Sequence, residues 1–501
     1  MNFWKRFGAW GGTPAPFHPQ ESEKEPPTGE ALRRRFANCG DFVTRPVGKS
    51  MVLCFINGMV DSKAVSEYVV RPLTENHIIY MYTRREALAE KICSSVVTNA
   101  EARICADCDQ AENALLTGNC VLLLDEGQAI AFETKSGDKR PVGEPTVENV
   151  VKGSKDAFVE TLSTNTALIR KKLRSAKLKA EKLTLGRQSH TSVMLLWYEG
   201  ITREPVVAQI RQRLEAIDVD AVLSTGSLEE YLFGRNNTLF PRTMYTERPA
   251  TLASALMTGR AAILVDGLPL AFILPTTLAM LMRAPEDRSQ NFIVSSLLSI
   301  LRYVSLLAAL FLPAFYVALA SFHQEMIPTR LMLSIIESKQ HVPFTTAEEA
   351  IIMLLAFEIL LEAGLRLPRN IGQTVSIIGG IIVGQSAVEA KLVSPVIVIV
   401  IAAAGITGFT IPNQDLAQAM RVWRFVLVVL SSICGLFALA TGAAYLIFRL
   451  CVVESFSVPY MAPFSGGRLS ALLKRGLLRP PMPAMKNRPA EPGTDNRRSQ
   501  R

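Results

Sequence analysis

Four long stretches without a charged residue dominate the second half of the chain, at residues 303–322, 371–388, 393–414 and 425–448. A helix needs roughly 20 apolar residues to cross a bilayer, and each stretch reaches or approaches that length. The sequence before residue 291 is instead charged and mixed. This division predicts a soluble N-terminal half followed by an α-helical membrane domain.

Basic residues flank the apolar region on both sides, at Arg283, Arg288 and Arg302 before it and at Arg449 after it. Because cytosolic flanks carry Lys and Arg, both ends are predicted to lie inside, and the number of crossings is even. The N-terminus lacks the apolar core of a secretory signal, so we expect the N-terminal half to stay in the cytosol.

About four to six membrane helices are therefore expected. Four crossings would lie at 303–322, 371–389, 393–411 and 425–448, with Pro313 kinking the first. A helix at 346–364 would then be interfacial or buried, and the punctuated segment at 326–343 would form a re-entrant or interfacial hairpin. Counting those two segments as well gives six.

The soluble half contains an internal repeat. "SMVLCFING" (50–58) matches "SVMLLWYEG" (192–200), and "GNCVLLLDEGQAIAF" (118–132) matches "GRAAILVDGLPLAF" (259–272), each at a separation of about 141 residues. A constant offset over two blocks indicates two copies of one α/β unit, each with a buried strand, a helix and a hairpin. By this repeat, the apolar residues 270–274 are a core strand and not a membrane span.

These patterns predict an α+β membrane protein in which two repeated cytosolic α/β subdomains precede the membrane helices. The connector between the repeats is basic and is predicted to be a helix with one apolar side, suited to a membrane surface or partner or simply solvated. The expected domains are a disordered arm (1–46), the first α/β subdomain (47–143), the basic helical connector (144–190), the second α/β subdomain (191–285), the helical membrane domain (286–456) and a basic disordered tail (457–501).

No motif for catalysis, metal or cofactor binding is complete. "GDFVTRPVGKS" (40–50) ends like a nucleotide-binding loop, but Val43 stands where that loop needs glycine. The eight cysteines and five histidines form no ligand set. We therefore expect no enzyme activity, no cofactor and no metal. The net charge of +9 comes with no nucleic-acid motif, and a basic tail beside anionic lipid explains it.

The segment "IGQTVSIIGGIIVGQSAVEAK" (371–391) has one small, polar face when placed on a helix. That face could be a close helix crossing of the Gly-xxx-Gly kind, or it could contact water. Its polar members favour water. The residues on this line are Gln373, Ser376, Gly380, Gly384, Ala387 and Lys391.

Carboxylates also occur in the helix predicted at 346–364. Glu358 and Glu362 share one side of it, with Glu348 nearby. At membrane depth these groups would need a cavity or cationic partners, because a charge in lipid costs several kcal/mol. In an interfacial helix they would simply be hydrated.

Several longer stretches resemble one family. "LFPRTMYTERP" (239–249), "PAFYVALASFHQEMIPTRLMLSI", "FEILLEAGLRLPRNIGQTVSIIGGIIVGQSAVEAKLVSP" and "SFSVPYMAPFS" are similar to the A subunit of GerA-type spore germinant receptors. The resemblance covers about residues 48 to 466. Its motif positions include Thr246, Glu247, Arg248, Pro249, His323, Glu325 and Pro328.

The resemblance implies a multi-pass protein of the spore inner membrane that works with a transporter-like B subunit and a lipoprotein C subunit. It also implies that A subunits associate as a ring that forms a cation channel, gated by nutrient sensing in a partner. Gln373, Ser376, Gly380, Gly384 and Ala387 would then line the pore. A solute transporter subunit and a non-conducting receptor scaffold remain the alternatives.

Two positions depart from the family pattern. Leu361 stands where arginine is common, and Ala250 where aspartate often follows Thr-Glu-Arg-Pro. If that arginine normally pairs with a glutamate, Glu358 or Glu362 needs another partner in this chain.

Overall fold

The computed structural model describes residues 25–48, 51–75, 85–97, 101–124, 127–136, 143, 145, 148, 152–222, 224–234, 238–366, 384–465, 476–488, 494, 496 and 498. Contacts divide the chain into two compact units. The first comprises residues 1–37 and 42–137, and the second comprises 38–41 and 138–501. Each unit is described by itself below.

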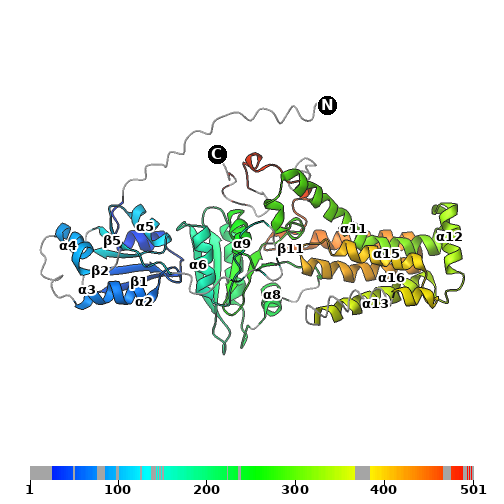
Figure 1. Ribbon diagram of the computed structural model, residues 1–501, viewed down its shortest axis with the longest axis horizontal. Coiled ribbons are helices and arrows are strands. Elements are labelled where there is room, and N and C mark those ends of the chain that lie inside the picture. Colours follow the sequence, from blue (N-terminus) through cyan, green and yellow to red (C-terminus); the bar gives the residue numbers. More distant parts are fainter. Residues whose placement is uncertain are drawn as a thin grey trace, which may run out of the picture. The chain divides into compact units, whose positions relative to one another are not determined.

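The first unit is an antiparallel five-stranded sheet covered by helices (Figure 1). Its spatial order is β1-β2-β4-β5-β3. Every residue of β4 is buried, as a central strand between two helical layers requires. The strands are β1 (Phe42–Val47), β2 (Met51–Ile56), β3 (Ala102–Cys105), β4 (Cys120–Leu124) and β5 (Gln128–Phe132). The helices are α1 (Gly29–Arg35), α2 (Ser62–Ala64), η2 (Val65–Val70), α3 (Arg71–Glu75), α4 (Arg85–Lys91), η4 (Ile92–Val96) and α5 (Cys108–Leu116).

The second unit begins with a sheet of the same order, β6-β7-β9-β10-β8, again antiparallel throughout. The predicted repeat of two α/β subdomains is therefore confirmed, and the predicted core strand at 270–274 is β10. The strands are β6 (Leu178–Leu185), β7 (Thr191–Tyr198), β8 (Met244–Thr246), β9 (Ala261–Val265) and β10 (Ala271–Leu274). The helices are α6 (Leu162–Lys172), α7 (Glu204–Glu215), α8 (Thr225–Phe233), α9 (Pro249–Met257), α10 (Leu278–Leu281) and η5 (Pro285–Arg288).

The segments that precede the two repeats were both predicted wrongly. The arm predicted to be disordered contains α1 and the edge strand β1, because "ALRRRF" buries Ala31, Leu32 and Phe36. The predicted connector helix ends at Lys172, and β6 follows as an edge strand paired with β7. Strand pairing supplies backbone hydrogen bonds to these segments, so the helical spacing of their apolar residues does not decide their structure.

The helical region follows in the second unit, and in Figure 1 its long helices run side by side. Two of its described helices, α11 and α16, are long and apolar enough to cross a membrane. α11 continues through Pro313 without a break. The elements are α11 (Phe292–Phe322), η6 (Gln324–Met326), α12 (Thr329–Lys339), α13 (Thr346–Arg366), a helical turn at 384–389, α15 (Pro395–Gly408) and α16 (Gln414–Val452).

α16 is a hairpin of two helices and not one continuous helix. Cys434 and Gly435 have non-helical dihedral angles, with φ +59° at Gly435. A Cβ on Gly442 would lie 2.8 Å from a methyl of Leu427, so the halves at 414–433 and 436–452 pack against each other. The prediction of one crossing at 425–448 is wrong, because the chain reverses direction at its centre.

The segment after α16 returns to the second α/β subdomain. Its β11 (Glu454–Ser455) and β12 (Val458–Pro459) form a short hairpin, and Tyr460 is fully buried. The backbone carbonyl of Tyr460 accepts a hydrogen bond from the N–H of Leu278 at 2.9 Å. The start of α11 and the end of α16 therefore both adjoin this subdomain. Residues 457–465 and the 3₁₀ turn η8 (Met482–Ala484) do not fit the predicted disordered tail.

Candidate functional site

Only part of the predicted pore face can be placed. Gln373, Ser376 and Gly380 lie outside the described residues. Gly384 and Ala387 lie on the helical turn at 384–389, where a Cβ on Gly384 would be 3.8 Å from Val398 of α15. Ala387 packs against the core of the helical region. Both residues thus face a helix neighbour at ordinary contact distance, and whether the line of small residues meets water stays a prediction.

Lys391 ends the same segment in an exposed position with φ +55°. The chain reverses around Lys391 because the backbone N–H of Leu392 donates to the carbonyl of Ala387 at 2.9 Å. This left-handed residue closes the helical turn before α15 begins. Lys391 is therefore at a helix end and not within a span.

Glu358 of α13 has the cationic partners that its place among apolar helices demands. Its carboxylate accepts hydrogen bonds from Arg421 at 3.0 Å and from Arg424 at 2.9 Å, both on α16. Arg424 is buried. One carboxylate between two guanidinium groups leaves an excess positive charge inside the helical region, and such groups mark functional sites in membrane domains.

Glu362 is different although it lies one turn away. It accepts from Arg366 on its own helix at 2.7 Å, and both side chains are mostly exposed. Although Leu361 stands where the family commonly has arginine, both glutamates have arginine partners. Glu358 pairs with Arg421 and Arg424, and Glu362 pairs with Arg366. Glu348 caps α13, because it accepts from the N–H of Thr345 at 2.8 Å.

Glu349 is the buried carboxylate that sequence reasoning missed. It is fully buried, accepts from the N–H of Ser394 at 2.7 Å and lies 3.1 Å from the ammonium of Lys339. It stands nine residues from Glu358, or about 180° around the helix. Its position on the face opposite Glu358 could have indicated from the sequence that Glu349 has different partners. α13 therefore ties α12 and the start of α15 on one face and α16 on the other.

Arg302 lies near the start of α11 and forms a bidentate pair with Asp287, at 2.6 and 2.8 Å. Arg479, from the C-terminal segment, donates to the carbonyl of Gln290 at 2.8 Å and to that of Arg288 at 3.0 Å. The N–H of Arg479 also bonds the hydroxyl of Ser296 at 3.0 Å. The two arginines anchor the entry to α11.

The family motif at 246–249 positions a loop. Thr246 donates to the carboxylate of Glu148 at 2.7 Å, and Arg248 donates to the carbonyl of the same residue at 2.9 Å. Burial raises the pKa of Glu148. Pro249 opens α9, where its fixed φ suits the first helical position, and the carbonyl of Glu247 accepts from Phe158 at 2.8 Å. Within the described residues, this motif holds the loop at Glu148 and begins α9.

The motif positions after α11 form its exit. His323 ends the helix, and its Cε1 would lie 3.0 Å from a Cβ on Gly435 at the tip of the α16 hairpin. Its buried Nδ1 finds no hydrogen-bond partner within the described residues. Glu325 and Pro328 are exposed in the turn that leads to α12. The close approach explains why glycine occupies the hairpin tip.

The second α/β subdomain and the helices meet at a junction that the sequence did not predict. The hydroxyl of Ser455 donates to the carbonyl of Arg242 at 3.0 Å and accepts from the N–H of Thr276 at 3.4 Å. Phe240 stacks on Trp423 of α16, with ring centroids 6.3 Å apart. The hydrogen bonds of Ser455 thus connect the segment after α16 to two loops of the sheet, and the ring contact of Trp423 connects the first half of α16 to one of these loops.

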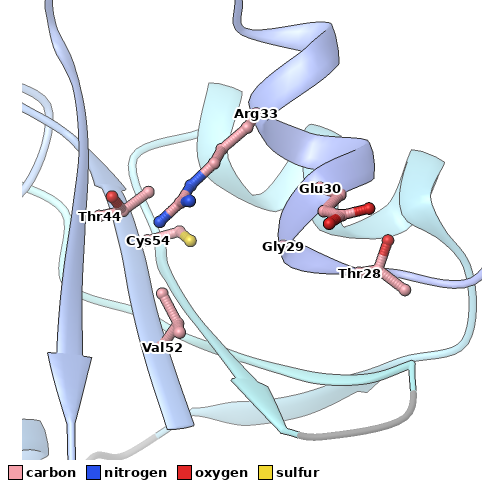
Figure 2. A pocket seen from close by; sticks show the side chains of 7 residues that line it. All are labelled: Thr28, Gly29, Glu30, Arg33, Thr44, Val52 and Cys54. Atoms are coloured by element: carbon pink, nitrogen blue, oxygen red, sulfur yellow. The ribbon is translucent and has the colours of Figure 1, made fainter.

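A pocket of about 380 Å³ lies in the first unit between α1 and the strands β1 and β2. Figure 2 shows the guanidinium of Arg33 directed toward Thr44 and Cys54. Burial raises the pKa of the Cys54 thiol to about 12, so the thiol stays protonated and is a poor nucleophile. Nowhere in the described ranges do three His, Cys, Asp or Glu side chains gather as metal ligands.

Fold and site together define a class of protein, one with paired α/β subdomains joined to an apolar helical region that contains ion-paired charges. Comparison with known proteins identifies the family. The Bacillus/Clostridium GerA spore germination protein family matches residues 30–491. The chain belongs to this family, which confirms the resemblance seen in its sequence.

Individual relatives are similar over nearly their whole length. Spore germination protein KA of Bacillus subtilis (strain 168) is 35% identical over 443 residues, which cover 88% of this chain and 80% of that protein. Spore germination protein A1 of the same organism is 34% identical and covers 88% and 90%. The crystal structure of the N-terminal domain of the A subunit of the Bacillus megaterium spore germinant receptor GerK3 matches with 26% identity and a TM-score of 0.38, covering 49% of this chain and 92% of that one.

Proposed function

We propose that this chain is the A subunit of a nutrient germinant receptor in the endospore inner membrane. Copies of it assemble into a ring that forms a ligand-gated cation channel, and a transporter-like B subunit and a lipoprotein C subunit complete the receptor. The observation that carries the receptor assignment is family membership over residues 30–491, with relatives named as spore germination proteins.

The helical region supports the channel part of the proposal. Glu358, Arg421 and Arg424 place paired charges among apolar helices, where charges are costly and usually mark a functional site. Gln373, Ser376, Gly380, Gly384 and Ala387 are the proposed pore lining, and charged groups close to a pore would set which ions enter it.

The junction supports coupling between domains. A partner that binds nutrient can open a ring only if it makes different contacts with the closed and open states. Ser455 and the stacked Phe240 and Trp423 would transmit such a difference from the second α/β subdomain to α16. Their hydrogen bonds and ring contact are specific to one arrangement, which makes them suitable as a two-state element.

Cation flux from proteoliposomes that contain the assembled receptor tests the channel. Gly380→Leu and Gly384→Leu should reduce nutrient-triggered flux at least tenfold, because a bulky side chain on the pore face blocks it. Gly408→Leu is the matched control, since nothing lies within 4 Å of a Cβ at that helical glycine.

Three results would contradict this proposal. Flux unchanged in both variants would show that the pore face is wrong. Saturable uptake of a single solute would indicate a transporter subunit, and intact assembly without any flux would indicate a scaffold. Protease added to the outside of spheroplasts should also leave residues 50–280 uncut, because these residues are proposed to be cytosolic.

A further inference from the structure

Two arginines flank one aromatic ring at the end of α8. The guanidinium carbon of Arg242 lies 4.3 Å from the ring centre of Phe233, and that of Arg213 lies 5.8 Å from the same centre. Arg213 also lies 5.0 Å from the ring centre of Phe456, which follows α16. The two rings are 5.2 Å apart. These four residues are called the arginine–phenylalanine cluster below.

The positive charge of the cluster is only partly balanced by its surroundings, because the charge of Glu229 acts on Arg242 against the effects of burial and of Arg213. Nε and Nη2 of Arg242 are buried, and within the part of the chain that the structure describes they form no hydrogen bond. The carboxylate of Glu229 accepts instead from the backbone N–H of Arg242 at 3.3 Å and from the hydroxyl of Tyr245. Burial and the nearby Arg213 lower the pKa of Arg242. Buried guanidinium donors without hydrogen bonds are costly, and an anion bound nearby would offset their positive charge.

Two members of the cluster, Arg213 and Phe233, line a cavity that a ligand can enter. A cavity of about 480 Å³ is lined by Arg213, Tyr231, Phe233 and Gly234 among others. Asp218 also lines it, but its carboxylate is already held by Arg187, whose Nε donates at 2.6 Å. At Gly234 no atom lies within 4 Å of where a Cβ would stand. The cavity therefore presents an exposed cation, an aromatic wall and free space.

The cluster also lies close to the end of a proposed membrane helix. Phe456 is four residues beyond Val452, the last residue of α16, which is at most about 14 Å of chain. Along the last turns of α16, Ile447, Phe448 and Val452 are between 56% and 60% exposed, as expected of side chains that face lipid. On the membrane placement of the proposed function, the cluster is at the depth of the lipid headgroups.

We propose that the arginine–phenylalanine cluster binds the phosphate of an anionic phospholipid headgroup, with Arg213 as the ligand in the cavity and Arg242, over the ring of Phe233, adding positive charge behind it. Arginine suits this role because its planar fork donates two hydrogen bonds to a phosphate. Tyr231 and Phe233 are amphipathic or aromatic groups of the kind that favour the membrane interface. The proposal rests on the membrane location in the proposed function and is independent of channel activity.

Thermal unfolding of the full-length protein in a neutral detergent tests this site, because a ligand that binds only the folded state raises the unfolding midpoint. Micelles doped with phosphatidylglycerol should raise the midpoint saturably, and phosphatidylcholine should not. Arg213→Gln should weaken the apparent affinity for phosphatidylglycerol at least tenfold, and Arg242→Gln, which removes a charge outside the cavity lining, should weaken it less. Arg203→Gln, an exposed arginine at the opposite end of α7, is the control and should change it less than twofold.

Arg213 is exposed, so its replacement keeps the fold even if Arg242→Gln does not. A wild-type response to phosphatidylglycerol in Arg213→Gln overturns the proposal. An equal response to inorganic phosphate, lost in the same variant, overturns the lipid assignment and makes a free anion the ligand. The measurement needs no ion flux, so its failure is distinct from failure of the channel proposal.

Discussion

The two α/β subdomains share a backbone but differ in how their charges are paired. Glycines with positive φ recur at equivalent places, at +92° for both Gly118 and Gly259 and at +85° for both Gly127 and Gly267. In the first subdomain, Arg35 pairs with Asp109 and Glu112 at the partly exposed surface. In the second, the pair of Arg170 and Asp41 is buried, with side chains 0% and 4% exposed. Turn glycines and apolar strands thus set the topology, and the charges distinguish the copy that joins the helices.

The largest difference between the copies should appear when a pairing arginine is removed. Arg170 is fully buried and binds both oxygens of Asp41, at 2.6 and 2.9 Å. Arg170→Leu leaves that carboxylate buried and unpaired, which should cost about 3–5 kcal/mol. Arg35→Leu in the first subdomain should cost only about 1 kcal/mol, because its pairs are partly exposed.

Native-state hydrogen exchange of the full-length protein measures these two costs, since it reports the opening free energy of each segment. Exchange should accelerate in β6 and β7 for Arg170→Leu, and only slightly in α1 and α5 for Arg35→Leu. Equal losses in the two variants would remove the proposed contrast between buried and surface pairing.

The turn glycines should behave alike in both copies. A Cβ on Gly118 would lie 3.0 Å from the carbonyl oxygen of Met59, and one on Gly259 would lie 3.3 Å from that of Ile201. Gly118→Ala and Gly259→Ala should therefore each cost about 1–2 kcal/mol from the left-handed backbone alone. Gly259 also adjoins Thr494, so its cost should be equal or larger.

The matched control is Gly226→Ala in α8, where a Cβ meets no atom within 4 Å. Alanine favours a helix, so this variant should be neutral or stabilising. The same exchange experiment compares the three variants. A cost at one repeat glycine and none at its counterpart would mean that the copies do not share their turn geometry.

The junction with the helices is specific to the second subdomain. Ser455→Ala removes the hydroxyl that contacts Arg242 and Thr276, and the unsatisfied buried groups should cost about 1–3 kcal/mol. Exchange should accelerate at 454–460 and at β10, and nutrient-triggered flux should fall. Ser457→Ala is the control, because Ser457 is exposed and its side chain hydrogen-bonds to the side chain of Gln209. A Ser455→Ala receptor with normal gating would exclude the junction as the coupling element.

The fold could be predicted where one pattern dominates. Two repeated blocks fixed the strands β2, β4, β7 and β9, and apolar length indicated α11. The edge strand β6 was missed because basic residues at helical spacing obscured its pairing with β7. The hairpin in α16 was missed because "SSICGLFALA" contains no charged residue, and the turn is revealed by the dihedral angles of Cys434 and Gly435 and by the contact between its two halves. Reversals inside apolar segments leave no trace in hydropathy.

The site was harder to predict because its partners are distant in sequence. Glu358 was identified as needing a cation, but Arg421 and Arg424 lie more than 60 residues away and only packing brings them close. Glu349 was passed over since it seemed one of several acidic residues at a helix start. Ser455 and Arg242, separated by 213 positions, had no shared pattern at all.

The smallest expected effect concerns the pH dependence of the second subdomain. Burial raises the pKa of Glu148 above its ordinary 4.5, although Thr246 and Arg248 act in the opposite direction. The folded state therefore holds this proton more tightly than the unfolded state. The stabilisation of the folded state by this bound proton is present below pH 4.5 and is lost as the pH rises through the folded pKa.

Glu148→Gln, which cannot titrate, should make hydrogen exchange near α9 less dependent on pH across this range. Because the first subdomain has its own set of carboxylates, exchange in β4 should keep its wild-type pH profile in the same molecules. A profile near α9 that stays unchanged in Glu148→Gln would show that burial of this carboxylate does not contribute to the difference between the subdomains.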